Sequence, residues 1–250
     1  MQPKILAREK AKQISGPMQR FDMTFRKQKK IPQVKICGLT RPQDLAVCHD
    51  LGVDYIGFNL HRKSKRYVDP SDASGLWQSF IRQHPTSTVT PVLVCVDADM
   101  ASLKLWTSLF PENLVLQLHG KETSAFLLDC KSVLKRDLWK AVAVIPDSVR
   151  AEAKEFQPVV QRVLLDSPVV PIGSDVAGGS GTAFRWQDYV DLIEQSFVGV
   201  AGGVNPDNVD LLLKLNPSFI DVASGCESAP GIKDSAKIQR LVSSCRKAFQ

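Results

Sequence analysis

The sequence predicts an α/β protein, a single (β/α)8 barrel preceded by a basic N-terminal extension. Three observations support this fold. Eight short apolar runs read as buried strands, and a segment compatible with a helix follows each of them. The length of 250 residues suits one barrel. The composition, with 44% hydrophobic and 23% charged residues, is typical of a globular domain.

The alternation starts at residue 34 and continues to the end of the chain. Strands are expected at 34–37, 54–60, 89–96, 114–118, 138–144, 162–166, 197–201 and 219–223. Helices are expected at 41–51, 71–84, 100–110, 122–135, 147–157, 185–196, 206–215 and 234–248. Strands that alternate with helices predict a parallel sheet covered by helices. Eight such units favour a closed barrel over an open doubly wound sheet.

Two of the helices have start signals in the sequence. Thr40, with Gln43 three residues later, fits a capping box for the first helix. Asn205-Pro206 predicts the start of the seventh helix, with asparagine as N-cap and proline at the first helical position. Gly38 separates the first strand from its helix, so Cys37 is expected at the carboxyl end of a barrel strand. Barrel enzymes collect their reactive groups at that end.

Charge divides the chain into an extension, residues 1–30, and a barrel domain, residues 31–250. The extension holds nine basic and two acidic residues, and the whole chain carries +6, so the domain carries −1. We expect the extension to be flexible or partly helical. A nucleic-acid site needs basic residues clustered on the folded body, and the domain gives no sign of one. No nucleic-acid partner is therefore predicted.

Cysteine usage points to a reducing compartment. The six cysteines are Cys37, Cys48, Cys95, Cys130, Cys226 and Cys245. None form a C-x-x-C pair, and the chain is long enough to bury a core without disulfides, so free thiols are expected. The four histidines show no zinc-ligand spacing. Without a signal-peptide core or a long apolar run, a cytoplasmic protein with no membrane contact is predicted.

Glycine-rich turns come late in the chain. Gly202-Gly203 follows the seventh strand, and Ser224-Gly225 follows the eighth. Barrels of this class commonly hold a phosphate there. A further glycine-rich piece covers 178–181. No G-x-G-x-x-G follows the first strand, so a dinucleotide cofactor has little support.

A thiol and a carboxylate are expected beside this phosphate site. Strand alternation lets Cys37 and Asp166 both face the barrel mouth, where they suit paired proton transfers on a sugar phosphate. The sequence shows no nucleophile–base–orienter triad, so acyl transfer is unsupported. Lys35 is expected to neutralise a buried carboxylate such as Asp221. His119 is expected to make structural hydrogen bonds.

Seven motifs follow one another in order over most of 34–250. They are Lys35-Ile36-Cys37-Gly38-Leu39-Thr40; Ile56-Gly57-Phe58 with Lys63-Ser64-Lys65-Arg66-Tyr67-Val68; Gln117-Leu118-His119-Gly120; Leu164-Leu165-Asp166-Ser167; Gly178-Gly179-Ser180-Gly181; Ala201-Gly202-Gly203-Val204-Asn205-Pro206; and Asp221-Val222-Ala223-Ser224-Gly225-Cys226-Glu227. Together they resemble the phosphoribosylanthranilate isomerase family of tryptophan biosynthesis. The resemblance implies an Amadori rearrangement of N-(5-phosphoribosyl)anthranilate in a barrel that needs no metal or organic cofactor.

The resemblance also implies roles for single residues. Asp166 matches the general acid that protonates the ring oxygen, and Cys37 matches the general base that removes the C2′ proton as a thiolate. A thiol, whose ordinary pKa is about 8.5, needs only a modest downward shift for this. Arg66 matches the arginine that holds the anthranilate carboxylate. The matches to the phosphate-binding loops are Gly202, Gly203, Ser224 and Gly225.

Two alternatives stay open. A histidine-pathway isomerase of similar reaction type would be expected to use paired aspartates, one at the end of strand one, where this chain has Cys37. A non-catalytic barrel could instead bind RNA or protein through its basic tail. The loop 167–177 looks longer than the family's usual loop, which bears on closure over the substrate. The expected partner is a small phosphoribosyl substrate, and the chain is expected to act as a monomer or a homodimer.

Overall fold

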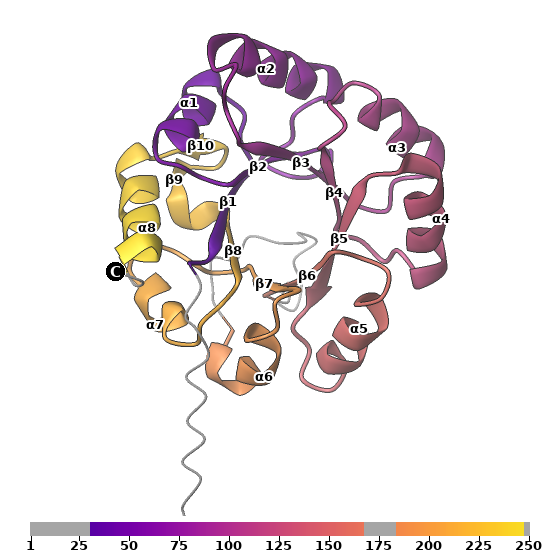
Figure 1. Ribbon diagram of the computed structural model, residues 1–250, viewed down its shortest axis with the longest axis vertical. Coiled ribbons are helices and arrows are strands. Elements are labelled where there is room, and N and C mark those ends of the chain that lie inside the picture. The colour runs from indigo at the N-terminus through magenta and orange to yellow at the C-terminus, as the bar shows by residue number, and fades with distance from the viewer. Residues whose placement is uncertain (1–30, 168–183, 248–250) are drawn as a thin grey trace, which may run out of the picture.

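The computed structural model describes residues 31–167 and 184–247, which form a closed barrel of eight parallel strands inside a ring of helices (Figure 1). The strands are β1 (Gln33–Cys37), β2 (Tyr55–Asn59), β3 (Thr90–Cys95), β4 (Val115–Leu118), β5 (Asp137–Ala143), β6 (Arg162–Asp166), β7 (Val198–Val200) and β8 (Phe219–Val222). They pair in chain order, and β8 pairs with β1 to close the barrel. The predicted fold class and all eight strands are confirmed.

A helix follows each strand on the outside of the barrel. The helices are α1 (Pro42–Asp50), α2 (Pro70–Gln83), α3 (Met100–Thr107), α4 (Ser124–Leu134), α5 (Val149–Phe156), α6 (Val190–Ile193), α7 (Val209–Leu213) and α8 (Ser235–Lys247). A 3-10 turn, η1 (Trp186–Tyr189), leads into α6, so the sixth helix is shorter than the sequence predicts. The seventh helix is also shorter than predicted. The expected extension 1–30 and the glycine-rich piece 178–181 lie outside the described residues.

The predicted cap of the first helix is wrong. The side chain of Asn205 makes the hydrogen bonds of an N-cap, but the regular helix begins three residues later than predicted. Pro42 sits at the first turn of α1 and holds the preceding Arg41 in an extended conformation, so Arg41 takes the N-cap position. The Thr40 hydroxyl instead donates to the carbonyl of Gly231 at 2.7 Å. The Asn205 carboxamide oxygen accepts from the backbone of Asp207 at 2.8 Å, and the turn it forms delays α7 until Val209.

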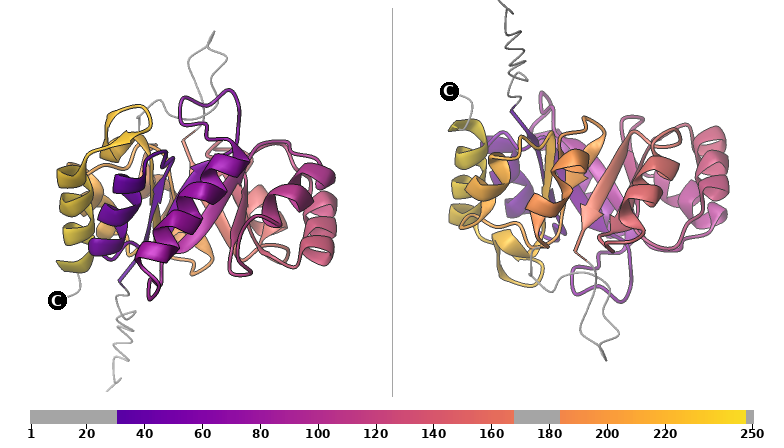
Figure 2. Two further views of the ribbon diagram at one scale, coloured as in Figure 1. Left: turned by 90° about the horizontal axis from the view of Figure 1, so that it is seen from above. Right: turned by 90° about the horizontal axis from the view of Figure 1, so that it is seen from below.

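The sequence did not predict the hairpin that follows β8. A short 3-10 turn, η2 (Ser224–Cys226), leads into β9 (Glu227–Ala229), which pairs antiparallel with β10 (Ile232–Lys233) before α8 begins. Two side views show this hairpin beyond one end of the barrel (Figure 2). The hairpin carries Glu227 and Lys233 back to the mouth, and both are buried there.

The apolar core lies mainly between the barrel and its helices, and a second cluster fills the barrel itself. Toward the amino ends of the strands, the rings of Tyr55, Trp139 and Phe219 pack with centroids 4.9–5.5 Å apart. All six cysteines are free and buried, as expected from the sequence.

Candidate active site

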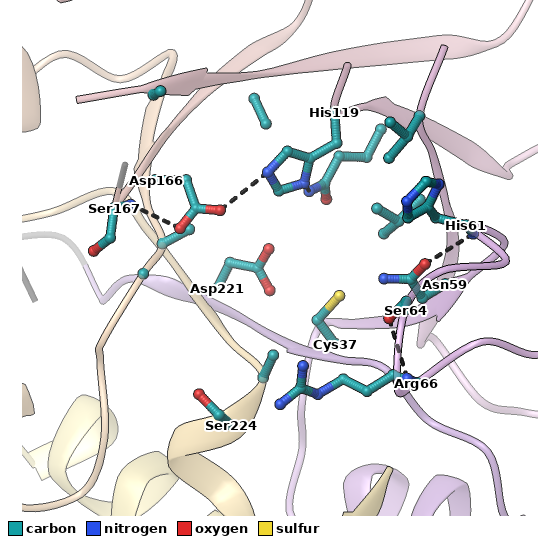
Figure 3. A pocket seen from close by; sticks show the side chains of 18 of the residues that line it. Cys37, Asn59, His61, Ser64, Arg66, His119, Asp166, Ser167, Asp221 and Ser224 are labelled. Atoms are coloured by element: carbon teal, nitrogen blue, oxygen red, sulfur yellow. Dashed lines mark hydrogen bonds and ion pairs between the residues drawn. The ribbon is translucent and has the colours of Figure 1, made fainter. Parts of the chain in front are cut away.

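A cavity of about 270 Å³ opens at the carboxyl ends of the strands. It collects side chains from almost every strand-to-helix loop, as Figure 3 shows for ten labelled residues. Six of the seven residues predicted from the sequence line it: Cys37, Arg66, Asp166, Gly202, Gly203 and Ser224. Gly225 borders a neighbouring hollow instead, together with Gly203, Ser224, Lys237 and Arg240. The structure therefore brings six of the seven predicted site residues together at the carboxyl ends of the strands.

Cys37 ends β1 with its thiol turned into the cavity (Figure 3). Gly57 on β2 makes room for it, because a Cβ at Gly57 would stand 2.9 Å from the Cys37 sulfur and 2.9 Å from Cε of Lys35. Burial raises the pKa of the Cys37 thiol, while the charge of Lys35 acts to lower it. In the free protein the net direction is upward, opposite to the modest decrease that the sequence argument required.

Lys35 lies two residues before Cys37 on the same face of β1, inside the barrel, and is fully buried. Its ammonium group donates to Asp221 Oδ2 and to Gln117 Oε1, both at 2.7 Å. Burial acts to lower the Lys35 pKa, but its interactions with Asp221 and Cys37 raise it above its ordinary value. The lysine is therefore a fixed positive charge beside the thiol, and its pairing with Asp221 confirms the sequence prediction.

Asp221 lines the cavity, but its second oxygen, Oδ1, is itself buried. The side chain is only 6% exposed, and Oδ1 has no hydrogen-bond partner within the described residues. Figure 3 shows this carboxylate between Cys37 and Asp166, directed into the cavity. A buried acceptor without a partner is costly, and the ion pair of the other oxygen with Lys35 offsets that cost.

Asp166 ends β6 on the opposite side of the cavity from Cys37 (Figure 3). Its Oδ2 lies 3.0 Å from Nε2 of His119, and its Oδ1 accepts from the backbone N–H of Ser167 at 2.8 Å. His119 is thus a structural hydrogen-bonder, as the sequence predicted, and its partner is the candidate acid itself.

Arg66 comes from the loop between β2 and α2, and Glu227 holds its guanidinium group. Arg66 Nε and Nη2 donate to the two oxygens of Glu227, each at 2.8 Å. Glu227 also accepts from Lys233 Nζ at 2.7 Å. The hydrogen bonds of Glu227 raise the pKa of Arg66. The end of the guanidinium that carries both terminal nitrogens is left for a carboxylate of a bound molecule.

The sequence argument gave Glu227 no role. It belongs to the motif that ends in Cys226-Glu227, but its partner Arg66 stands 161 residues away. Buried acidic residues are rare without a partner, so a glutamate in an otherwise apolar and glycine-rich stretch was the available signal. Ser64 and Asn59 also line the cavity without having been predicted.

The glycines after β7 form a turn that only glycine accommodates easily. Gly202 and Gly203 have φ of +67° and +70°. A Cβ at Gly202 would collide with the backbone and hydroxyl of Ser167. The Asn208 carboxamide donates to the carbonyl of Gly203 at 2.8 Å, which fixes the turn against the start of α7. Successive glycines in such a turn make a concave site that suits an anion.

The described residues hold no cluster of three or more histidine, cysteine or acidic side chains that could bind a metal ion. In the same part of the chain, no helix is long and apolar enough to cross a membrane.

A closed (β/α)8 barrel with a thiol and a carboxylate facing one another over a cavity at its strand ends defines a class of barrel enzyme built for proton transfer. Within that class, residues 34–244 match the model of the "N-(5'phosphoribosyl)anthranilate (PRA) isomerase" family. The chain belongs to this family.

Individual relatives agree with the family match. N-(5'-phosphoribosyl)anthranilate isomerase of Agrobacterium fabrum is 35% identical over 208 residues, which cover 83% of this chain and 91% of the relative. The crystal structure of the Thermotoga maritima enzyme superposes with a TM-score of 0.73 at 29% identity and covers 86% of this chain and 99% of that one. A solved isomerase in complex with reduced 1-(o-carboxyphenylamino)-1-deoxyribulose 5-phosphate has a TM-score of 0.69 at 27% identity, with the same coverage.

Proposed function

We propose that Cys37 and Asp166 are the base and the acid with which this chain carries out the reaction of its family. The chain is an isomerase of tryptophan biosynthesis that converts N-(5'-phosphoribosyl)anthranilate to 1-(2-carboxyphenylamino)-1-deoxyribulose 5-phosphate. The observation that supports these roles most strongly is that Cys37 and Asp166 approach one cavity from opposite sides, on β1 and β6.

The Amadori rearrangement needs one proton delivered and one removed. Asp166 gives its proton to the ring oxygen of the ribose, the C1′–O bond breaks, and the nitrogen lone pair forms the Schiff base. Cys37, as thiolate, then takes the proton from C2′, and the electrons of that bond neutralise the Schiff base as an enolamine. The enolamine tautomerises to the ketone product. Proton transfers of this kind need an acid and a base on two faces of the reacting carbons.

Binding groups surround this pair. The free end of Arg66 suits the anthranilate carboxylate, and the turn at Gly202-Gly203, with Ser224 and Gly225, suits the phosphate. Two buried cations near Cys37, Lys35 and Lys233, both act to lower the pKa of that thiol.

The assay that tests the function uses the purified full chain and two substrates. Loss of the fluorescence of N-(5'-phosphoribosyl)anthranilate should follow enzyme concentration, while the histidine-pathway aminoaldose substrate should not be turned over. Turnover of the second substrate alone would establish the paired-aspartate type of isomerase instead. An inactive, folded chain that retains RNA would favour the non-catalytic barrel.

Location and assembly are also proposals. We infer a cytoplasmic enzyme, because free and buried thiols suit a reducing compartment. We expect it to work as a monomer or a homodimer. The barrel domain 31–250 is expected to be complete without the extension 1–30.

A further inference from the structure

A continuous row of hydrogen bonds crosses the barrel from the charge beneath Cys37 to the candidate acid. It starts at Lys35 Nζ, which lies 2.7 Å from Gln117 Oε1. Gln117 Nε2 lies 3.4 Å from His119 Nδ1, and His119 Nε2 lies 3.0 Å from Asp166 Oδ2. The row joins β1, β4 and β6, and its first two members are buried. The proposed mechanism uses neither Gln117 nor His119.

The buried end of this row fixes which group donates and which accepts in each of its hydrogen bonds. A lysine ammonium group can only donate, so the atom of Gln117 facing Lys35 must be the carboxamide oxygen. The carboxamide nitrogen therefore faces His119. Because Gln117 is only 2% exposed and its oxygen is held at 2.7 Å, turning the amide over would place an NH2 group against the ammonium.

The amide in turn fixes the imidazole. A carboxamide NH2 only donates, so Nδ1 of His119 must accept and therefore carries no hydrogen. The ring hydrogen then sits on Nε2, where it donates to Asp166 Oδ2. The other neutral tautomer would set two N–H groups against one another at Gln117. At Asp166 it would set two lone pairs against one another in the carboxylate form, and in the acid form its bare Nε2 would accept the proton that Asp166 has to deliver. An imidazolium would keep the first of these conflicts.

We propose that Gln117 is a positioning residue that holds His119 as the neutral tautomer with hydrogen on Nε2. His119 is then a permanent donor to Asp166 and not a second acid. This inference deepens the proposed function, and it rests on Asp166 being the group that delivers the proton.

The arrangement leaves Asp166 with one defined task. Oδ1 accepts from the backbone of Ser167, and one lone pair of Oδ2 accepts from His119. The remaining lone pair of Oδ2 can carry the proton that goes to the ring oxygen. After delivery the carboxylate keeps both hydrogen bonds, so the group does not turn away before the ring has opened. A second acid at His119 would allow proton delivery from the wrong position.

Nitrogen NMR of the imidazole rings tests this without turnover. The full chain is labelled with 15N in histidine, and spectra are recorded at neutral pH without substrate. The chain has four histidines, and the ring signals missing in His119→Gln belong to His119. We expect a bare Nδ1 and a protonated Nε2. A protonated Nδ1 in the wild-type protein, as the other tautomer or as imidazolium, would overturn the proposal.

Substitution of Gln117 tests what sets the tautomer. In Gln117→Glu, a carboxylate oxygen replaces the donor, so Nδ1 should become protonated and kcat should fall at least about tenfold with a smaller change in KM. In Gln117→Leu, the apolar leucine suits the buried position but neither donates to nor accepts from the His119 ring. The ring should then become a mixture of the two neutral tautomers. An unchanged His119 spectrum in both variants would remove Gln117 from the account.

The matched control is Gln33→Glu. Gln33 also lies inside the barrel, where its oxygen accepts from Arg162 at 2.9 Å, but it is at the opposite end from the cavity. His119 signals should not move in this variant. His49, His61 and His84 serve as internal references in every spectrum. Because the free protein is observed, a bare Nδ1 in a chain without isomerase activity would reject the proposed function and leave the tautomer assignment standing.

Discussion

The two sides of the cavity support their reactive groups in different ways. On the Cys37 side, buried charges surround the thiol. Lys35 and Asp221 are 0% and 6% exposed and make an ion pair at 2.7 Å. On the Asp166 side, His119 and Asp166 are 31% and 17% exposed and join through a hydrogen bond at 3.0 Å. A nearby positive charge favours the ionised form that the base Cys37 needs. Hydrogen bonds hold the side chain of the acid Asp166 in a fixed orientation toward the cavity.

The largest effects are expected from the two reactive groups themselves. Cys37→Ala and Asp166→Asn should each lower kcat about 10³-fold, because each removes a proton transfer that no neighbour replaces. Both substitutions are small, so circular dichroism and thermal unfolding should stay close to wild type. Near-wild-type turnover of N-(5'-phosphoribosyl)anthranilate in either variant would show that the two sides have been assigned wrongly.

Lys35→Met tests the charged side more selectively. The ammonium charge lowers the pKa of the Cys37 thiol, so its removal should raise that pKa further and move the rising limb of kcat/KM to higher pH. At neutral pH we expect a loss of at least about tenfold. Leaving Asp221 buried without its partner should also lower the free energy of unfolding by about 3–5 kcal/mol.

The double variant Lys35→Met/Asp221→Asn separates these two effects. Removal of the unpaired carboxylate should restore much of the free energy of unfolding. The rising limb of kcat/KM should return only part of the way toward its wild-type pH. A limb that does not move in the single variant would mean that the lysine does not act on the thiol.

Glu227→Gln should weaken substrate binding more than it slows the chemistry. Arg66 loses the carboxylate that orients it through two hydrogen bonds of 2.8 Å, so KM should rise about tenfold while kcat changes less. Glu122→Gln is the control, because Glu122 is an equally buried partner of a lysine, Lys140, on the other side of the barrel. The control should lose stability without a comparable rise in KM. Equal KM values in the two variants would contradict the binding role of Arg66.

The smallest effect is expected from deletion of residues 1–30. All groups assigned above lie within the barrel domain, so turnover of the shortened chain should stay within about twofold of the full chain. Steady-state kinetics of the two proteins provide the comparison. A large loss would show that the extension contributes to the barrel or to an interface.

The sequence predicted the barrel because the strand pattern is local and repeats eight times. It missed where α1 and α7 begin because Pro42 and the turn at Asn205 moved each start by one to three residues. Cys37 and Asp166 were noticed because each ends a strand, and the family resemblance supplied their roles. Glu227 was missed because its function depends on Arg66, 161 residues away, and only the fold brings the pair together. The orientation of Gln117 likewise follows from Lys35, which the strand pattern does not reveal.

The pH dependence of kcat/KM in Cys37→Asp tests the central assignment most directly. An aspartate ionises ordinarily at a pKa of about 3.9 and a cysteine at about 8.5, while burial raises the Cys37 pKa further in this barrel. If Cys37 is the base, the variant should keep measurable turnover and its rising limb should move to lower pH by more than one unit. A limb that stays where the wild-type protein has it would show that another group takes the proton from C2′.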